Sequence, residues 1–199
     1  FNAKTNYIIK EDNQEKKKNF IIGCIARWDP DKDHNNLFEA LKILDRNNVN
    51  YICELVGPMM TYDNQDLKKL INTSQIDKSK LILKGFVKDL NKVYENLDVC
   101  VLASRTEAFP IVIGEAMIAG TPVIATDTGD VRKIVNHFGW VVSPHNPKQL
   151  SESILDAISK SLDNKVWYKF RLDARNHIVN NYSINDMVNS YNRLWNLKL

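Results

Sequence analysis

Short, continuous apolar runs recur along the chain between residues 20 and 144, and mostly polar stretches separate them. Continuous runs are typical of strands buried on both faces of a parallel sheet, whereas half-exposed strands alternate apolar and polar residues. The runs are FIIGCIAR (20–27), YICELVG (51–57), LILKGF (81–86), DVCVLAS (98–104), PVIATDT (122–128) and GWVVSP (139–144). The pattern therefore predicts a sheet of about six buried strands.

Between these runs, apolar residues recur at the three- and four-residue spacing of a helix that is buried along one side. The spaced positions are Leu37, Leu41 and Leu44; Leu67, Leu70 and Ile71; Leu90, Val93, Tyr94 and Leu97; Leu150, Ile154 and Ile158. Because strand and helix alternate, the sequence predicts an α/β fold with an open, doubly wound parallel sheet. This domain would cover residues 20–162, after a polar lead-in of residues 1–19.

Residues at the expected helix ends agree with this alternation. Asn146 and Pro147 fit the N-cap and first position of one helix, and Gly120 fits the stop of another. Ser183 and Asp186 resemble the capping box of a helix near the carboxyl terminus. The caps therefore mark helices inside the alternating region and one beyond it.

After about Lys165 the strand-like runs stop and two helical patterns remain. Their apolar positions are Val166, Phe170, Ala174 and Ile178 in the first pattern, and Met187, Tyr191, Leu194 and Trp195 in the second. We expect residues 163–199 to form C-terminal helices, which either cap the domain or reach another one.

Charge and cysteine content narrow the class of protein. The 27 basic and 24 acidic side chains give a net charge of +3, well short of the basic patch of a nucleic-acid-binding protein. Cys24, Cys53 and Cys100 lie far apart in apolar runs, which favours buried thiols in a reducing compartment over disulfides or metal ligands. No run approaches the roughly 18 apolar residues of a membrane span, so we expect a cytoplasmic protein.

In a doubly wound sheet the ligand lies beyond the carboxyl ends of the strands, so the strand-to-helix loops are candidate sites. The first loop, ARWDPDKDHNN, carries Arg27 at the strand end and Lys32 just before a helix that Asp33 can cap. The planar fork of an arginine and the mobile charge of a lysine could hold a diphosphate without a metal. Two ordinary surface cations would fit the same loop.

Other nucleotide and metal motifs are weak or missing in the sequence. Asp29 and Asp31 form a D-x-D pair, but the proline between them and the flanking cations make this a poor match to a metal site. The chain has neither a G-x-G-x-x-G nor a P-loop lysine motif, which argues against a dinucleotide oxidoreductase and a P-loop NTPase. We therefore expect no metal ligands and no cofactor.

A second loop lies in the stretch RTEAFPIVIGEAMIAGTPVIATDTGD (105–130), where it leads into a helix. Pro110 fits the first helical position, because its missing N–H costs nothing there. The amides of Ile111, Val112 and Ile113 would then be free to bind an anion.

Two acids flank this helix start. Glu107 precedes it, and Glu115 lies about five residues into the helix, roughly 7 to 8 Å further along the axis. The carboxylates could accept hydrogen bonds from hydroxyls on both sides of the diphosphate of a nucleotide sugar. A loop acid and a polar helix position without a ligand fit the spacing equally well.

These segments resemble the retaining GT-B glycosyltransferases of family 4, which transfer a sugar from a nucleotide diphosphate donor. TEAFPIVIGEAMIAGTPVIATDTGD is similar to the E-x7-E signature of that family, with Glu107 and Glu115 as its acids. IARWDPDKDHNNLFEAL is similar to the upstream arginine and lysine segment, and LILKGFVKDLNKVYENLDVCVLASRTE to the segment between them. The ordered match runs from about Phe20 to Ile158 and implies the Rossmann-like C-terminal half of a GT-B fold.

The resemblance implies a role for each matching position. Arg27 and Lys32 would bind the donor diphosphate and stabilise charge on the departing nucleotide. Glu115 would bind the ribose hydroxyls, and Glu107 would bind the transferred sugar near the reacting centre. The remaining donor-binding positions are Phe86 and Val87, whose backbone would meet the base, and Phe109, Pro110, Ile111 and Val112, which would line the phosphate and sugar.

The sequence departs from the commonest family pattern in three places. Pro110 replaces a frequent glycine, Asp33 follows Lys32 where glycine is usual, and the loop VGPMMTYD replaces a more glycine-rich turn. The first two changes keep the chemistry of a helix start, whereas the third puts the ligand contact of that loop in doubt.

The family also has an N-terminal Rossmann-like domain that binds the acceptor. Phe1 looks like the residue that closes an N-G-[IV]-D-x-x-x-F segment at the start of the donor domain, so we expect a C-terminal part that is inactive alone. Its last helices would cross back to the other domain and expose apolar residues such as Trp195. The expected partners are a UDP-, GDP- or ADP-sugar and, through the missing half, a saccharide or lipid-linked saccharide; membrane association would also depend on that half.

The implied function is transfer of a hexose-type sugar, with retention of configuration, in polysaccharide biosynthesis. A sugar-nucleotide epimerase can share this architecture, but its usual arrangement of paired histidines and an acid is not evident in His34, His137, His145 or His177. A module that binds nucleotide sugars or another protein without catalysis is a further alternative.

Overall fold

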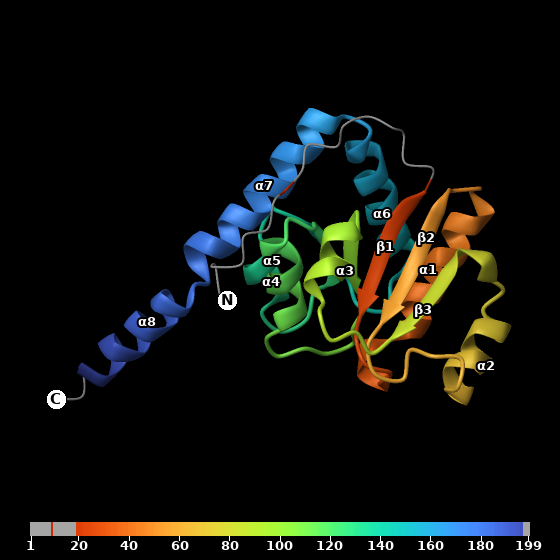
Figure 1. The fold of residues 1–199 in the computed structure, drawn as a ribbon, viewed down its shortest axis with the longest axis horizontal. Coiled ribbons are helices and arrows are strands. Elements are labelled where there is room, and N and C mark those ends of the chain that lie inside the picture. Colours follow the sequence, from red (N-terminus) through yellow and green to blue (C-terminus); the bar gives the residue numbers. More distant parts are fainter. Residues whose placement is uncertain (1–8, 10–18, 197–199) are drawn as a thin grey trace.

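The computed structural model places all the strands of its described residues in one sheet, with parallel pairing throughout (Figure 1). It describes residue 9 and residues 19–196. The rest of the expected lead-in, including Phe1, and residues 197–199 lie outside the described residues.

Each of the apolar runs forms one strand, which confirms the predicted sheet. The strands are β1 (Phe20–Ile25), β2 (Tyr51–Val56), β3 (Leu81–Gly85), β4 (Val99–Leu102), β5 (Val123–Thr126) and β6 (Trp140–Val142). They lie in the order β3-β2-β1-β4-β5-β6, so the chain builds outward from β1 and then returns to place β4 on the other side of β1. The carboxyl ends of β1 and β4 therefore form the switch point at which such sheets bind ligands.

Helices connect the strands and cover both faces of the sheet. They are α1 (His34–Arg46), α2 (Gln65–Thr73), α3 (Asn91–Asn96), α4 (Ile111–Ile118), α5 (Val131–Val135), α6 (Pro147–Ser161), α7 (Asn164–Asn181) and α8 (Ile184–Asn196). The helical spacing in the sequence predicts α1, α2, α3, α6, α7 and α8, and the residues at its ends predict α4. The five-residue helix α5 carries no such signal.

The core is split by the sheet into two layers of buried side chains. One layer contains Ile22 of β1 and Leu41 of α1, and the other contains Val56 of β2 and Ile113 of α4. Helix α7 reaches both layers, because Trp167 near its start packs in the first and Ile178 near its end packs in the second. Helix α7 thus caps the domain, one of the two arrangements that the sequence leaves open.

The predicted helix boundaries at Gly120 and Asn146 are confirmed. Gly120 follows the end of α4 with φ +78°; its N–H donates to Met117 O, and the N–H of Thr121 donates to Ala116 O. This pair of bonds satisfies carbonyls that the end of a helix leaves without partners. At the start of α6, the side chain of Asn146 accepts a hydrogen bond of 3.0 Å from the Gln149 N–H.

Cations of α7 reinforce the end of α4. Arg171 Nε donates to Gly120 O at 2.8 Å, and Arg175 donates to Ile118 O. Cationic side chains are favourable at the carboxyl end of a helix because the carbonyl dipoles there are negative. Helix α7 therefore holds α4 in place through charge as well as through packing.

The cysteines confirm the prediction of buried, unpaired thiols. Cys24, Cys53 and Cys100 are free and buried. Burial in apolar surroundings raises the pKa of the Cys24 thiol to about 12, because the thiolate would lose its hydration. The three thiols are therefore protonated, and unreactive, near neutral pH.

Helix α8 extends away from the body of the domain (Figure 1). Its apolar side chains Tyr191, Leu194 and Trp195 are 52%, 59% and 66% exposed. The expected exposure of Trp195 is therefore confirmed, while the contact of these helices with another domain stays a prediction.

We expect Gly23→Ala to destabilise the fold. Gly23 lies in the middle of β1, and a Cβ there would sit 2.1 Å from Leu97 Cδ1 and 2.8 Å from Leu97 Cδ2. Overpacking a core in this way typically costs about 1 to 3 kcal/mol. The free energy of unfolding, measured by urea denaturation, should fall by that amount.

The variant Leu97→Ala provides the control. It should be destabilising alone, because Leu97 is buried, but it should relieve the clash when it is combined with Gly23→Ala. If the two losses simply add in the double variant, the clash with Leu97 is not the cause.

Candidate functional site

The loops that follow β1 and β4 meet at the switch point of the sheet. After β1 the chain makes a short 3-10 turn at Pro30–Lys32, and after β4 it runs through residues 103–110 to α4. The backbone N–H of Arg105 donates to Asp31 O at 2.7 Å, so the two loops are joined directly. Adjacent parallel strands place the loops side by side, which brings together residues that are far apart in the chain.

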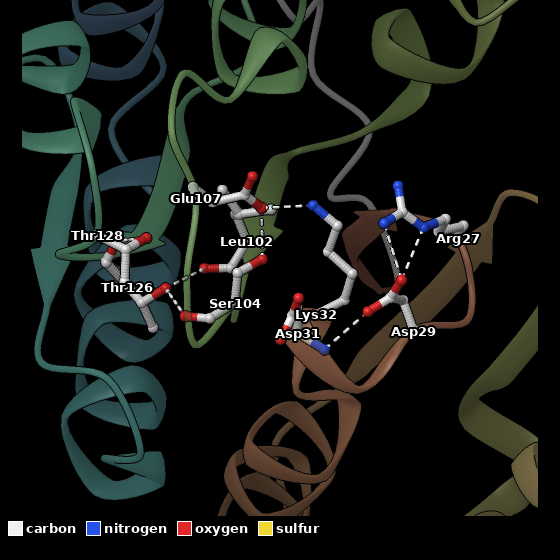
Figure 2. A network of polar contacts seen from close by, with 9 residues as sticks. All are labelled: Arg27, Asp29, Asp31, Lys32, Leu102, Ser104, Glu107, Thr126 and Thr128. Carbon is white, nitrogen blue, oxygen red and sulfur yellow. Dashed lines mark hydrogen bonds and ion pairs between the residues drawn. The ribbon is translucent and has the colours of Figure 1, made fainter.

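Lys32 and Glu107 form the central contact between these loops (Figure 2). Lys32 Nζ donates to Glu107 Oε1 at 2.6 Å, and the two side chains are only 19% and 11% exposed. Ser104 Oγ donates to the same oxygen at 2.7 Å. The structure thus brings together a cation and an acid that the sequence predicts to share one site, and both hydrogen bonds end on Oε1 rather than on Oε2.

The backbone beside Ser104 is held from β5. Thr126, at the end of that strand, donates through Oγ1 to Ser104 O at 2.6 Å and more weakly to Leu102 O at 3.4 Å (Figure 2). Both Ser104 and Thr126 are fully buried. A continuous set of hydrogen bonds therefore runs from β5 through the loop after β4 to Lys32 in the loop after β1.

Gly129 packs closely against the backbone of the turn at Glu107. Its φ is +52°, and a Cβ there would lie 2.2 Å from Glu107 O and 2.4 Å from Ala108 O. The N–H of the next residue, Asp130, donates to Ala108 O at 3.1 Å. Only glycine combines this backbone conformation with so close an approach, so a glycine at this position is needed for the observed position of the loop that carries Glu107.

Arg27 lies at the surface and pairs with Asp29. Its Nε and Nη2 atoms are 2.9 and 2.8 Å from Asp29 Oδ2, and 62% of its side chain is exposed. Asp29 also accepts a hydrogen bond from the Asp31 N–H at 2.9 Å. This bond, and after it the bond from Arg27, lowers the pKa of the Asp29 carboxyl. The described contacts of Arg27 are with Asp29 rather than with the Lys32–Glu107 pair (Figure 2).

Asp33 links three of the loops. It adopts a left-handed conformation (φ 44°, ψ 53°) and caps α1 by accepting the Asn36 N–H at 3.3 Å, as predicted. Its Oδ2 atom lies 2.8 Å from His145 Nδ1, in the loop after β6, and 3.4 Å from Arg105 Nε. The left-handed backbone explains why glycine would also suit this position.

His34 is the first residue of α1 and directly follows Asp33. It is 3% exposed, and its ring stacks on that of Trp28 with a centroid separation of 5.1 Å. Burial lowers the pKa of the His34 imidazole to about 4, because the charged form would be poorly solvated. The side chain is therefore neutral near pH 7.

The start of α4 differs from the prediction by one residue. Pro110 is the N-cap, with an extended backbone (φ −77°, ψ 97°), and the helix begins at Ile111. The N–H of Ile113 donates to Pro110 O at 3.1 Å, so the prediction that this amide is free is wrong. Proline has no side-chain oxygen to cap the helix, so the amides of Ile111 and Val112 are the ones that helix geometry leaves for a ligand.

Glu115 accepts a hydrogen bond from a residue that sequence reasoning missed. Tyr94 Oη, on α3, donates to Glu115 Oε2 at 2.9 Å, and Tyr94 itself is 1% exposed. The helical pattern marks Tyr94 only as a core position. Ser104 was missed as well, although its place three residues before Glu107 in a polar loop is a signal that could have found it.

The other predicted donor-binding residues lie after β3 and β4. Phe86, Phe109 and Ile111 are 74%, 46% and 58% exposed, whereas Pro110 is buried and Val87 and Val112 are half-buried. Large exposed apolar side chains beside a charged centre offer contact surface to a ligand. Their roles in binding stay predictions.

The described part of the chain has neither a cluster of metal ligands nor a membrane-spanning helix. Residue 9 and residues 19–196 contain no group of three or more His, Cys, Asp or Glu side chains placed to hold a metal ion. Among the helices of those residues, none combines the length and the apolar character that a membrane span requires.

Comparison with known proteins gives a consistent family. The family model described as glycosyl transferases group 1 matches residues 6–176. The UDP-Gal:alpha-D-GlcNAc-diphosphoundecaprenol alpha-1,3-galactosyltransferase of Escherichia coli is 28% identical over 173 residues, which are 85% of this chain and 43% of that enzyme.

Solved structures agree. A glycosyltransferase from Rickettsia africae superposes with a TM-score of 0.78 at 27% identity, covering 90% of this chain and 48% of that one. The C-terminal domain of a glycosyl transferase group 1 family protein from Francisella tularensis gives a TM-score of 0.66 at 26% identity, covering 83% of this chain and 87% of that domain. This chain thus spans a little under half the length of the E. coli and Rickettsia proteins.

We expect acid to destabilise the folded protein through protonation of His34. The unfolded chain takes up a proton on this imidazole below about pH 6.5, whereas the folded protein keeps it neutral down to a pKa of about 4. Stability is therefore lost as the pH falls between these values. From pH 7 to pH 5 the loss in the free energy of unfolding should be about 2 kcal/mol.

Urea denaturation of the wild type and of His34→Phe at both pH values checks this expectation. Phenylalanine keeps an aromatic ring against Trp28 but cannot take up a proton, and all other titrating groups are common to the two proteins. The variant should lose about 2 kcal/mol less than the wild type. Equal losses would mean that His34 does not control the acid stability.

Proposed function

This chain belongs to the glycosyl transferases group 1 family, and we propose that it binds the nucleotide diphosphate sugar donor of a retaining glycosyltransferase. The sugar transferred is of the hexose type, and the acceptor is a saccharide or a lipid-linked saccharide. Lys32 and Glu107 carry this proposal, because they join a cation and a hydrogen-bond acceptor at the switch point of the sheet. The galactosyltransferase relative, named for a UDP-sugar and a diphosphoundecaprenol acceptor, supports both substrate classes.

In this proposal, binding of the nucleotide sugar changes the partner of Lys32 from Glu107 to the diphosphate. The diphosphate carries more negative charge than one carboxylate, so Lys32 Nζ turns from Glu107 toward the phosphate oxygens. Arg27 lies in the same loop and is exposed, so its guanidinium is free to move from Asp29 to the phosphates at small cost. The amides of Ile111 and Val112 add the positive end of α4 to the anion site.

The two acids then contact hydroxyls on either side of the diphosphate. Glu107, released by Lys32, accepts a hydrogen bond from the transferred sugar close to the reacting carbon. Glu115, oriented by Tyr94, accepts the ribose hydroxyls. The backbone at Phe86 and Val87 meets the base, while Phe109 supplies apolar contact to the sugar and phosphate.

Catalysis in this scheme is electrostatic. Bond breaking leaves additional charge on the nucleotide diphosphate, and Lys32 and Arg27 stabilise that charge in the transition state. Positioning by Glu107 and Glu115 reduces the entropic cost of reaching it. We propose that no metal is needed and that acceptor binding belongs to the other half of a longer protein.

We expect Lys32→Ala and Arg27→Ala each to weaken nucleotide binding by roughly 10- to 100-fold. A charge-assisted hydrogen bond contributes about 1.5 to 3 kcal/mol, and each tenfold in affinity is worth about 1.4 kcal/mol. The measurement is calorimetric titration with UDP, GDP, ADP and their sugars, without and then with magnesium. Binding should occur without magnesium and should select one base.

Lys148→Ala on α6 and Arg46→Ala at the end of α1 are matched controls. Both remove an exposed cation from outside the proposed site and should leave the affinity unchanged. Equal affinity of Lys32→Ala, Arg27→Ala and the wild type would remove these residues from the donor site.

We expect Glu107→Gln to keep nucleotide binding and to lose sugar transfer. In the free protein Glu107 competes with the diphosphate for Lys32, so removal of its charge should leave the affinity for the nucleotide equal or raise it up to about tenfold. In the full-length protein, transfer should fall by about 100-fold or more, because the sugar loses an anionic acceptor at the reacting centre.

Glu152→Gln, which removes an exposed carboxylate of α6, controls for the change in net charge. Titration measures the first effect, and radiolabelled sugar transfer the second. Weaker nucleotide binding in Glu107→Gln, or full transfer activity, would contradict the role given to Glu107.

A further inference from the structure

One oxygen of Glu107 accepts hydrogen bonds from two side chains, and only one of these side chains is proposed to bind the ligand as well. Lys32 Nζ and Ser104 Oγ both donate to Oε1, at 2.6 and 2.7 Å. Under the proposed function Lys32 leaves this oxygen when the diphosphate binds. Ser104 has no such competing role, so its bond alone holds the carboxylate once the donor is in place.

We propose that Ser104 is a positioning residue: its hydroxyl holds Oε1 of Glu107 so that Oε2 is presented to the transferred sugar. This inference rests on the donor-binding function proposed above. It assigns Ser104 no contact with the substrate. The hydroxyl acts through Glu107 and determines which carboxylate oxygen the sugar meets and in what orientation.

The surroundings of Ser104 suit this task. Ser104 is fully buried, so water does not compete for its hydroxyl. Its carbonyl oxygen is held by Thr126 Oγ1 at 2.6 Å, which fixes the backbone from β5 (Figure 2). Because the Ser104 backbone is anchored to the sheet, its hydroxyl cannot follow Glu107 if the carboxylate turns. The hydrogen bond therefore restrains the carboxylate.

The backbone of Glu107 is restrained from the other side. Gly129 approaches Glu107 O so closely that a Cβ would lie 2.2 Å from it, and the Asp130 N–H binds Ala108 O at 3.1 Å. With the main chain fixed, the remaining freedom of Glu107 is rotation about its side-chain bonds. The Ser104 hydroxyl limits that rotation, and small displacements at a reacting centre carry large costs in rate.

Ser104→Ala tests the proposal in calorimetric titrations of this chain. The probes are UDP, GDP, ADP and their sugars, and the quantity compared is the ratio of Kd for the bound nucleotide to Kd for its sugar. Ser104→Ala should change Kd for the nucleotide less than twofold, because Lys32 and Arg27 are intact. The ratio should fall about tenfold, the usual effect of one lost hydrogen bond to a charged group.

A double variant separates positioning from a general structural effect. In a Glu107→Gln background, the further change Ser104→Ala should have no effect on the ratio, because the charged acid that it orients is gone. In a Glu115→Gln background its effect should persist in full. Ser151→Ala is the matched control, since Ser151 is a buried serine whose hydroxyl donates to Lys148 O in α6, and it should resemble the wild type.

Kinetics of the full-length protein provide the second readout. Ser104→Ala should lower kcat about tenfold, because a misoriented carboxylate stabilises the transition state less well, and it should raise KM for the nucleotide sugar by up to about tenfold, in line with its Kd. KM for the acceptor should change less than threefold, because Ser104 acts only through the acid that contacts the donor sugar.

Each contrary outcome has a distinct meaning. If Glu107→Gln loses the sugar contribution and Ser104→Ala keeps it, the role of Ser104 is wrong and the donor site stands. The role is also wrong if Ser104→Ala lowers the ratio equally with and without Glu107. If the wild type binds no nucleotide, or if Glu107→Gln has no effect on the ratio, the proposed function itself fails.

Discussion

The pairing of β1 with β4 is the constraint on which the site depends. The chain lays β1, β2 and β3 outward and then returns across the sheet, so the loops after β1 and β4 end beside each other with no intervening strand. Neighbouring strands lie only about 4.8 Å apart, which is close enough for side chains of the two loops to touch. Lys32 and Glu107, 75 residues apart in the sequence, meet for this reason.

The two cations of the first loop are held very differently. The Lys32 side chain is largely buried and shares Glu107 with a buried serine, whereas Arg27 pairs with Asp29 on an open surface. Breaking an exposed ion pair costs little, while separating Lys32 from Glu107 requires that a ligand supply equivalent charge. The free site is therefore internally neutralised, and a polyanion is the kind of ligand that can displace the acid from Lys32.

Helix α4 connects this chemistry to the stability of the domain. Its start lies at the acidic loop, its body carries Glu115 among buried apolar residues, and its end is closed by Gly120 and by the arginines of α7. A residue on such an element has little freedom to move, which suits the proposed contact of Glu115 with a ribose hydroxyl. Tyr94 adds a further restraint by binding one Glu115 oxygen.

The sequence by itself determined the strands, most helices and the caps at Gly120, Asn146 and Asp33, because these depend on local periodicity and on the conformations that single residues prefer. It also predicted that Lys32 and Glu107 share one site, through the strand-to-helix loops that carry them, and the two side chains do meet. The sequence did not predict the short helix α5, the place of Pro110 at the N-cap or the bonded amide of Ile113. A five-residue helix is too short to show a periodic pattern, and the other two features depend on a shift of one residue in the helix start. Only the tertiary structure decided that Ser104 and Lys32 share one oxygen of Glu107 and that Tyr94 binds Glu115, because hydrogen bonds between distant segments depend on strand order and side-chain rotamers, which no local pattern encodes.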